Sequence, residues 1–279
     1  MANSHLFTYV PLLFLALSPM SNAMQVLPKF RYYVTLKCYQ FDKIYQVGDS
    51  ISDTGNLIVS STFARHPYGE TFFKNAIGRC SNGLLMIDFI DEDCAEKNAN
   101  SLFMVGEIGV QNQVYYSIKS IQELEDMVPQ IVCTIANPVR KVIRNFGDIR
   151  VGHCLKGLNN FSKYHKEHLI HFVVTIQAIE ELKIEHPNTT IIYGDYYNAF
   201  VIFLFSAGFD LNSLQKACRG SGGTYKFNLT KMCGLPGVSV CPSPSRCMSW
   251  DGIHLTQHAY KLMAGWLIRS FLPKLQNHV

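Results

Sequence analysis

Short apolar runs that break on a glycine and an acidic residue recur along this chain. The runs at residues 44–47, 102–105 and 191–193 lead directly into Gly-Asp or Gly-Glu. Apolar runs of this length that end at a glycine are typical of buried strands. We therefore expect three strands, each of which ends just before an acidic side chain.

Helical spacing of apolar residues separates these runs. Between residues 161 and 182 the apolar positions recur at three- to five-residue steps, and His186-Pro187 ends the pattern. A C-terminal stretch carries four apolar residues on one face: Tyr260, Met263, Leu267 and Phe271. Strands that alternate with helices predict an α/β fold in which helices cover both sides of a parallel sheet. Sites in such folds form at the carboxyl ends of the strands, where the glycine–acid breaks lie.

The first 23 residues have the pattern of a secretory signal peptide. Residues 10–17 form an apolar stretch too short to span a bilayer, and residues 21–23 offer small side chains for a cleavage site. An uncleaved membrane anchor is the alternative interpretation. No other stretch approaches the length of a transmembrane helix, so we expect a secreted protein whose residues 24–279 form a single domain without an integral membrane segment.

Composition narrows the possible partners. The 279 residues are 48% hydrophobic and 16% charged, which is enough apolar material for one substantial core. The net charge is only +4 and the basic residues are scattered, which argues against a nucleic-acid partner. Nine cysteines and three N-x-S/T sequons, at Asn160, Asn188 and Asn228, fit a glycoprotein of an oxidising compartment. Because the number of cysteines is odd, at least one thiol is free or pairs with another chain.

Ser50 follows the first apolar run and is the first candidate for chemistry. A serine hydroxyl becomes a nucleophile only when a base takes its proton and a third group orients that base. Gly-Asp-Ser is also a common turn sequence, so Ser50 alone indicates little. Asp53 and Asn56 are expected to hold this turn through side-chain to backbone hydrogen bonds.

The segment SWDGIHLT, residues 249–256, strengthens the case for that serine. Asp251 stands three residues before His254. On a tight turn this spacing lets the carboxylate accept a hydrogen bond from one imidazole nitrogen while the other nitrogen faces outward, so one segment supplies a base and the group that orients it. The alternative interpretation is a helix N-terminus, with Asp251 as a capping acid and His254 on the surface.

Further stretches extend the pattern along the chain: GDSISDTGNL, PYGETFFKNAIGRCSNGLLMIDFI, SLFMVGEIG, HCLKGLNNFSKYH, TIIYGDYYNAF, FNLTKMCGLPGV and SWDGIHLTQHAYKLMA. Together they resemble the GDSL-type esterases and lipases of plants, within the SGNH hydrolases, over nearly all of the chain after residue 35. The resemblance implies a flavodoxin-like three-layer α/β/α sandwich with a mostly parallel sheet. It also implies Ser50 as nucleophile, His254 as general base and Asp251 as its partner. An α/β-hydrolase fits less well, because Ser52 stands where the elbow G-x-S-x-G needs its second glycine.

The chain departs from this family in three places. Family members carry a long segment with a glycine block of the type NFAVAGATA before SLFMVGEIG, whereas only residues 91–100 lie there in this chain. Where GEIGGND is typical, this chain has GEIGVQNQ, with Gln111 in the place of the asparagine donor unless the register shifts by one to Asn112. A further segment is missing between Ile149 and His153, and we expect its usual strand to be missing with it.

These departures bear on the oxyanion hole. The resemblance implies the backbone N–H of Ser50 as one donor, with Gly109 and Asn112 as further candidates. The glycine donor of the missing block has no replacement in this sequence. Loss of one donor typically lowers turnover about 10²- to 10³-fold, so an intact triad could still give a poor enzyme.

Two functions of different classes follow. The leading hypothesis is a secreted carboxylic-ester hydrolase that acts on a small-molecule ester through an acyl-enzyme on Ser50, without a metal or cofactor. The alternative is a catalytically inactive or truncated family member that binds a small molecule or glycan. A metal site is disfavoured, because His165, His168 and His171 lie at three-residue steps but form neither HExxH nor HxxEH.

Overall fold

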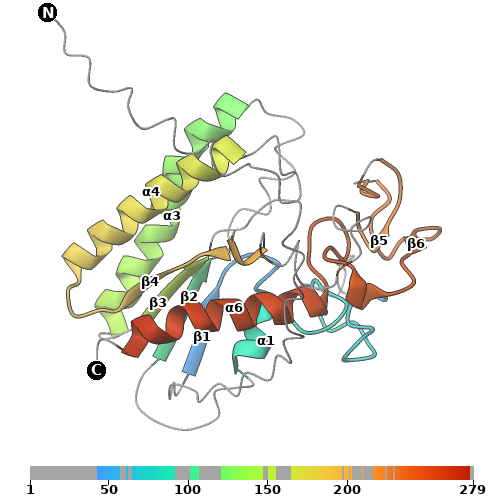
Figure 1. Ribbon diagram of the computed structural model, residues 1–279, viewed down its shortest axis with the longest axis horizontal. Coiled ribbons are helices and arrows are strands. Elements are labelled where there is room, and N and C mark those ends of the chain that lie inside the picture. The colour runs from blue at the N-terminus through green and yellow to red at the C-terminus, as the bar shows by residue number, and fades with distance from the viewer. Residues whose placement is uncertain are drawn as a thin grey trace, which may run out of the picture. The chain divides into compact units, whose positions relative to one another are not determined.

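The computed structural model describes residues 43–56, 61, 65–91, 101–106, 121–146, 150–154, 165–196, 198–200, 202, 209, 216–223, 225–228 and 230–276 (Figure 1). The chain divides into two compact units, Met1–Thr35 and Leu36–Val279, and every described residue belongs to the second. The expected signal peptide, residues 1–23, therefore lies outside the described residues. Within the described part of the chain, no helix is both long enough and apolar enough to cross a membrane.

In the part of the chain that the structure describes, four parallel strands form the central sheet, and they lie in the order of the sequence. β1 (Lys43–Val47), β2 (Ser101–Gly106), β3 (Arg150–Cys154) and β4 (Ile191–Gly194) pair as β1-β2-β3-β4. β1, β2 and β4 are the strands that the apolar runs predicted. The expectation of a missing strand near residues 149–153 is wrong. β3 forms there from RVGHC, which has no apolar run, because β2 and β4 pair with its backbone on both sides.

β1 lies at one edge of the described sheet. Among the strands that the structure describes, it pairs with β2 alone. Tyr45 and Val47 are 42% and 47% exposed. Tyr45 stacks on Phe103 of β2, with ring centroids 4.7 Å apart. Ile44 packs on the opposite face, against the core formed with α1 (Met86–Asp91). The strand is therefore held by one neighbouring strand and by side-chain packing.

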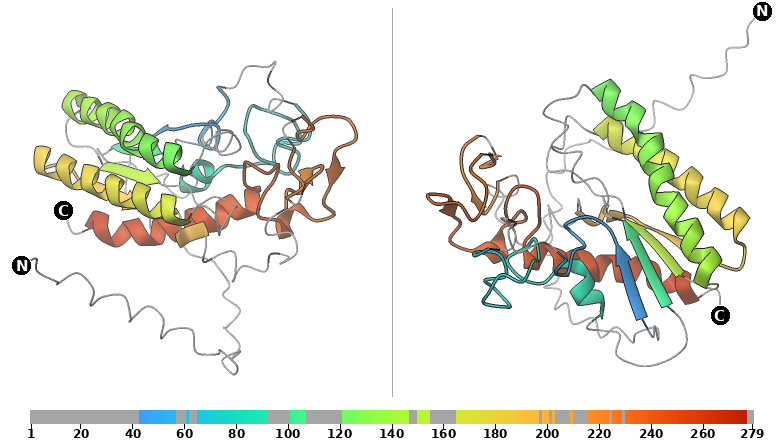
Figure 2. Two further views of the ribbon diagram at one scale, coloured as in Figure 1. Left: turned by 90° about the horizontal axis from the view of Figure 1, so that it is seen from above. Right: turned by 180° about the vertical axis from the view of Figure 1, so that it is seen from behind.

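Helices cover both faces of this sheet (Figure 2). α3 (Ile121–Phe146) and α4 (His165–Glu185) pack against each other on one face, whereas α6 (Gln257–Gln276) packs with α1 on the other. The apolar spacing predicted α4 and α6 but not α3. Two prolines inside α3, Pro129 and Pro138, explain that omission, because proline removes a helical hydrogen bond and argues against a helix in sequence.

Strand β2 shows how the sheet is buried between these layers. Leu102 and Met104 belong to the core shared with α1 and α6, while Phe103 and Val105 belong to the core shared with α3 and α4. Successive side chains of a strand point to opposite faces, so all four residues are buried. The chain therefore has an α/β fold with a parallel sheet between helical layers, as the alternating patterns predicted.

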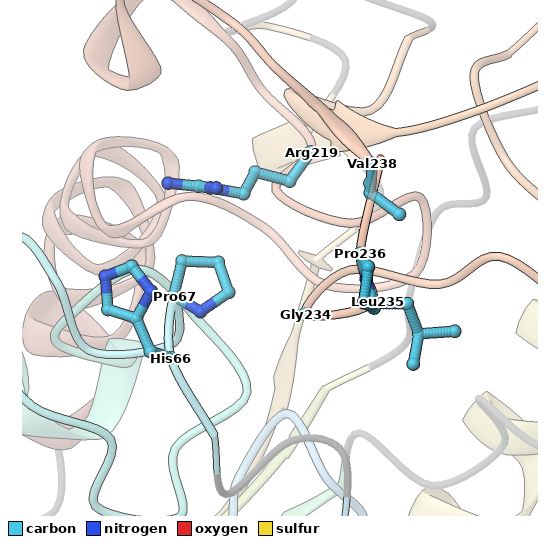
Figure 3. Close-up of a pocket in the computed structure, with 7 residues that line it drawn as sticks. All are labelled: His66, Pro67, Arg219, Gly234, Leu235, Pro236 and Val238. Atoms are coloured by element: carbon cyan, nitrogen blue, oxygen red, sulfur yellow. The ribbon is translucent and has the colours of Figure 1, made fainter.

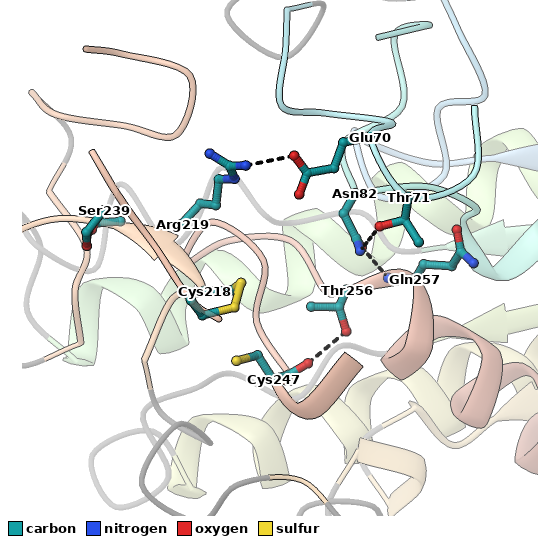
Figure 4. Close-up of a disulfide and its surroundings, with 11 residues drawn as sticks. Glu70, Thr71, Asn82, Cys218, Arg219, Ser239, Cys247, Thr256 and Gln257 are labelled. Carbon is teal, nitrogen blue, oxygen red and sulfur yellow. Dashed lines mark hydrogen bonds and ion pairs between the residues drawn. A yellow bond between two sulfur atoms is a disulfide. The ribbon is translucent and has the colours of Figure 1, made fainter. Parts of the chain in front are cut away.

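A loop-rich segment precedes α6. Its regular elements are short: the antiparallel pair β5 (Arg219–Gly220) and β6 (Ser239–Val240), and the 3₁₀-helix η4 (Pro244–Arg246). A disulfide joins Cys218 to Cys241, and the sulfur of Cys247 lies within 4.8 Å of both (Figure 4). Tyr68 and Trp250 pack with these cysteines in a separate buried cluster. The segment is thus held by a covalent link and aromatic packing rather than by long strands.

Candidate active site

Ser50 lies in a tight turn directly after the carboxyl end of β1. The backbone N–H of Ser52 donates to the carbonyl oxygen of Asp49 over 3.0 Å, and the N–H of Ile51 donates to the Asp49 carboxylate over 3.1 Å. Ile51 is buried in the core formed with α1 and α6, which anchors the turn, while Ser50 is half-buried. The glycine break thus leads to a serine beyond the end of a strand, as expected.

The chain after this turn is fixed by two charged side chains. Asp53 Oδ1 accepts hydrogen bonds from the backbone N–H groups two and three residues ahead, over 2.9 and 2.6 Å, and from the side chain of Asn56. Arg79 donates to the carbonyl oxygen of Thr54 over 2.8 Å and forms a bidentate ion pair with Asp88 of α1. One guanidinium therefore connects the serine turn to α1.

A loop before α6 presents Asp251 and His254. The backbone N–H of Trp250 donates to the carbonyl oxygen of His254 over 2.8 Å, which closes the loop. Gly252 has a φ of +97°, and a Cβ at this position would collide with the Phe227 ring, so only glycine fits the bend without strain. Asp251 Oδ1 accepts from the backbone N–H groups two and three residues ahead over 2.9 and 2.7 Å, which leaves its other oxygen for the imidazole.

Backbone hydrogen bonds from the disulfide segment hold this loop. The N–H of Cys218 donates to the carbonyl oxygen of Ser249 over 3.0 Å, and the N–H of Arg219 donates to that of Trp250 over 2.7 Å. Both donors lie at or next to the Cys218–Cys241 disulfide. The disulfide therefore stabilises the backbone segment that carries Asp251.

A side-chain network attaches the segment around Tyr68 to the start of α6 (Figure 4). Asn82 Oδ1 accepts from the backbone N–H of Gln257 over 2.7 Å, and its amide donates to the hydroxyl of Thr71 over 2.6 Å. The Gln257 side chain in turn accepts from the N–H of Leu84 over 2.9 Å. Two regions far apart in sequence are thereby joined at Gln257, the first residue of the helix that follows His254.

Ser50, His254 and Asp251 form one hydrogen-bonded chain. Ser50 Oγ lies 2.8 Å from His254 Nε2, and His254 Nδ1 lies 2.6 Å from Asp251 Oδ2. Asp251 and His254 are each 1% exposed, and α6 begins only at Gln257. The helix-capping interpretation of SWDGIHLT is therefore wrong, because the tight turn aims both side chains inward at Ser50 and not along a helix.

Electrostatics place the protons in this chain. Burial raises the pKa of the Asp251 carboxyl, but the charge of His254 and the hydrogen bonds from its ring and backbone outweigh burial and leave the pKa below its ordinary value. A carboxylate only accepts hydrogen bonds, so Nδ1 carries a proton and Nε2 accepts from the Ser50 hydroxyl. This arrangement is suited to removing the Ser50 proton and stabilising the imidazolium that results.

Tyr68 contacts the same carboxylate and was not among the residues predicted from sequence. Its hydroxyl donates to Asp251 Oδ2 over 2.8 Å, the oxygen that also faces His254. The two residues lie 183 positions apart, so no local spacing could reveal the contact. The sole signal in the sequence is an aromatic residue within the stretch PYGETFF.

The other predicted oxyanion donors, Gly109 and Asn112, lie outside the described residues, as does Gln111. Of the three predicted oxyanion donors, only Ser50 therefore lies within the described residues. His165, His168 and His171 lie in α4. Within the described part of the chain, the group of side chains close enough to share a metal ion is Cys218, Cys241 and Cys247, and two of these form the disulfide.

Two of the three sequon asparagines are described, and both are exposed. Asn188 follows α4, and Asn228 lies in the loop-rich segment. The carbonyl oxygen of the Asn228 side chain accepts hydrogen bonds from the backbone N–H and the hydroxyl of Thr230, over 2.9 and 2.8 Å. Asn160 lies outside the described residues.

A pocket of about 260 Å³ lies beside His66 and Pro67, which directly precede Tyr68 in the chain, and Ser50 does not line it (Figure 3). His66 and Pro67 form one side, Arg219 forms another, and apolar residues between positions 234 and 238 complete the wall. Arg219 donates to the Glu70 carboxylate over 2.7 Å, so its charge is already paired. The pocket therefore combines an apolar wall with the polar side chains of His66 and Arg219.

Known plant proteins match most of this chain. Acetylajmalan esterase from Rauvolfia serpentina is 32% identical, covering 85% of this chain and 87% of its own length. GDSL esterase/lipase At5g03980 from Arabidopsis thaliana is also 32% identical, over 84% of this chain and 90% of its own. GDSL esterase/lipase At1g31550 from the same plant is 29% identical, over 84% and 85%.

The same alignments show that this chain is internally shorter than its relatives. The alignment with acetylajmalan esterase runs over 344 positions, whereas 85% of a 279-residue chain is about 237 residues. Roughly a third of the aligned positions therefore have no counterpart here. This agrees with the missing internal segments that the resemblance predicted.

The family assignment rests on two independent matches. The family described as GDSL-like Lipase/Acylhydrolase matches residues 109–267, which is more than half of the chain. The relatives above extend the match to the N-terminal region that carries Ser50. The chain therefore belongs to the GDSL-like lipase/acylhydrolase family and is a GDSL-type ester hydrolase.

Proposed function

We propose that this protein hydrolyses a carboxylic ester of a small molecule through an acyl-enzyme on Ser50. The observation that carries the proposal is the continuous chain from Ser50 Oγ through the His254 ring to Asp251 Oδ2, with distances of 2.8 and 2.6 Å. Each contact has the length that proton transfer between a nucleophile, its base and an orienting carboxylate requires.

The proposed reaction has two halves. Ser50 Oγ attacks the ester carbonyl carbon while His254 Nε2 takes the hydroxyl proton, and the imidazolium returns that proton to the leaving alcohol. A water molecule then attacks the acyl-enzyme, again losing its proton to His254, and releases the carboxylic acid and Ser50. Asp251 stays ionised throughout and stabilises the imidazolium. His254 relays both protons that move, from Ser50 to the leaving alcohol and from water back to Ser50, so no step calls for a cofactor or metal.

The oxyanion that forms on the carbonyl oxygen needs hydrogen-bond donors. We assign the backbone N–H of Ser50 as one donor, and Gly109 and Asn112 as the candidates for the others. Removing one such donor from an enzyme typically costs about 10²- to 10³-fold in turnover. The absent glycine block therefore favours a modest turnover, with the triad still able to form the acyl-enzyme.

A fluorophosphonate probe tests the proposal directly. The probe forms a phosphonate ester with a serine whose base and oxyanion site are assembled, and fluoride leaves. We expect the secreted, oxidised protein to gain one adduct by intact mass, located on the peptide that contains Ser50, and to hydrolyse p-nitrophenyl acetate. An acetyl ester is the natural first substrate because three of the relatives are named acetylajmalan esterases.

A folded protein that takes up no probe and hydrolyses no ester would support the alternative function instead. In that case the chain would be an inactive family member that binds a small molecule or glycan, and binding would be indifferent to Ser50. The internal shortening of the chain is the observation that favours this alternative.

We also propose that the protein is secreted and carries N-linked glycans. The Cys218–Cys241 disulfide fits an oxidising compartment, and the sequon residues Asn188 and Asn228 are exposed. Peptide N-glycosidase treatment of protein from the culture medium of plant cells is expected to lower its mass and convert the occupied asparagines, Asn160 included, to aspartate. Asn228→Gln, which removes one exposed sequon, is the matched control. A mass that the treatment leaves unchanged would contradict glycosylation.

The sheet order supports a flavodoxin-like ancestry with one strand removed. A flavodoxin-like sheet is ordered 2-1-3-4-5, and removal of its strand 2 leaves four strands in sequential order. The described sheet has this sequential order, and the absent glycine-block segment lies between β1 and β2. We therefore infer a three-layer SGNH-type sandwich that has no counterpart of strand 2 in the described sheet.

A further inference from the structure

The Asp251 carboxylate accepts four hydrogen bonds, and one of them comes from outside its own loop. Oδ1 accepts from the two backbone N–H groups ahead of it, and Oδ2 accepts from His254 Nδ1 over 2.6 Å and from the Tyr68 hydroxyl over 2.8 Å. Tyr68 is fully buried, as is the carboxylate. Both lone-pair directions of Oδ2 are therefore occupied, one by the base and one by a tyrosine.

Several contacts make Tyr68 a rigid donor. Its ring packs edge-to-face on Trp250, with centroids 6.4 Å apart and planes at 78°. Its backbone N–H donates to the carbonyl oxygen of Arg65 over 3.1 Å. Gly69 follows with a φ of +75°, and a Cβ there would collide with the carbonyl oxygen of Asn75, so only glycine allows this close packing of the backbone next to Tyr68.

The Tyr68 hydroxyl keeps its proton and therefore remains a hydrogen-bond donor. Burial raises the pKa of Tyr68, and the nearby Asp251 charge raises it further, so the phenol keeps its proton. The titratable and charged groups around this contact are His254, Cys80, Cys233, Glu70, Arg219, Asp49 and Asp53. Burial raises the pKa of both thiols, to about 12 for Cys233, so neither becomes charged near neutral pH.

We propose that Tyr68 is a positioning residue for the triad: its hydroxyl holds Oδ2 of Asp251 against Nδ1 of His254 and shares the negative charge on that oxygen. The proposal rests on the proposed function and adds a residue to it. Without the hydroxyl, Oδ2 would have only the imidazole as partner, while the two backbone N–H groups would still hold Oδ1. The less-shared charge would attract the imidazolium more strongly, so His254 would hold its proton to a higher pH.

Tyr68→Phe tests this role, because it removes the hydroxyl and keeps the ring against Trp250. We expect kcat to fall about tenfold with KM unchanged, which corresponds to the loss of one charge-assisted hydrogen bond. The low-pH limb of the kcat/KM profile should move up by about half to one pH unit. Tyr196→Phe is the matched control, because Tyr196 is equally buried and its hydroxyl has no hydrogen-bond partner in the described part of the chain.

A readout without substrate separates this proposal from the proposed function. ¹⁵N imidazole NMR follows the titration of His254, whose midpoint should rise in Tyr68→Phe and stay unchanged in Tyr196→Phe. If the protein hydrolyses no ester but the midpoint still rises, the positioning role stands and the proposed function fails. If the enzyme is active and Tyr68→Phe changes neither kcat nor the midpoint, the positioning role is overturned.

A measurement on the unmodified protein covers the case in which Tyr68→Phe does not fold. The Tyr68 hydroxyl proton is expected as a slowly exchanging resonance with a nuclear Overhauser contact to the Nδ1 proton of His254, because both protons point at one oxygen. A Tyr68 hydroxyl that exchanges freely with water and shows no such contact would overturn the proposal.

Discussion

Ser50→Ala is expected to lower the turnover of an activated ester by about 10⁴- to 10⁶-fold, the range seen when a serine hydrolase loses its nucleophile. The structure gives the reason. Ser50 Oγ is the atom 2.8 Å from His254 Nε2, and alanine leaves the base with no proton to take. Stopped-assay measurement of p-nitrophenol release at saturating substrate checks this, and fluorophosphonate labelling should disappear in parallel.

Ser52→Ala is the matched control for that experiment. Ser52 lies in the same turn, but its hydroxyl accepts a hydrogen bond from Gln46 over 2.6 Å on the β1 side. Its loss should leave turnover within about tenfold of the unmodified protein, since a single neutral hydrogen bond contributes about 1 kcal/mol. Equal activity of Ser50→Ala and the unmodified protein would rule out the acyl-enzyme mechanism.

Asp251→Asn is expected to lower kcat about 10⁴-fold while the protein remains folded. The two backbone N–H groups that donate to Oδ1 would keep the amide oxygen in that position. The amide nitrogen would then replace Oδ2 and donate to His254 Nδ1, which forces the imidazole proton onto Nε2. A protonated Nε2 cannot accept the Ser50 hydroxyl proton, so the nucleophile is not activated.

The kinetics of Asp251→Asn should be compared with its unfolding curve near pH 7. The pKa of Asp251 lies below its ordinary value in the folded protein, so its stabilising contribution is complete above that ordinary value and is lost as the pH falls through the folded-state pKa. At neutral pH the carboxylate is fully ionised in the unmodified protein. A turnover within tenfold of that protein would show that Asp251 does not orient His254.

The fold was predictable where a strand has its own apolar pattern and unpredictable where neighbours impose the structure. β1, β2 and β4 are apolar runs that end at a glycine, so their sequences indicate strands by themselves. β3 contains Arg150, Gly152 and His153, which do not indicate a strand. It becomes a strand because β2 and β4 form hydrogen-bonded ladders with it on both sides. The helix α3 was missed because Pro129 and Pro138 interrupt a pattern that tertiary packing nevertheless stabilises.

The same distinction applies to the site. Asp251 and His254 are three residues apart, so a single turn determines their geometry, and the spacing predicted it. The hydrogen bond between Ser50 and His254 spans 204 positions and could be anticipated only because both residues follow recognisable motifs. Tyr68 has neither a local spacing nor a reactive group, so its contact with Asp251 emerges only in three dimensions.

The edge position of β1 makes the two halves of the triad unequal in local stability. Asp251 and His254 are held by a disulfide-supported loop, four hydrogen bonds to one carboxylate and complete burial. Ser50 follows a five-residue strand that, in the described sheet, has a single neighbouring strand. The least stabilised elements open first in local unfolding, so the amide hydrogens of β1 should exchange with solvent before those of β2. On heating, the nucleophile would therefore leave its place while the acid–base pair is still formed, and activity would be lost before the fold.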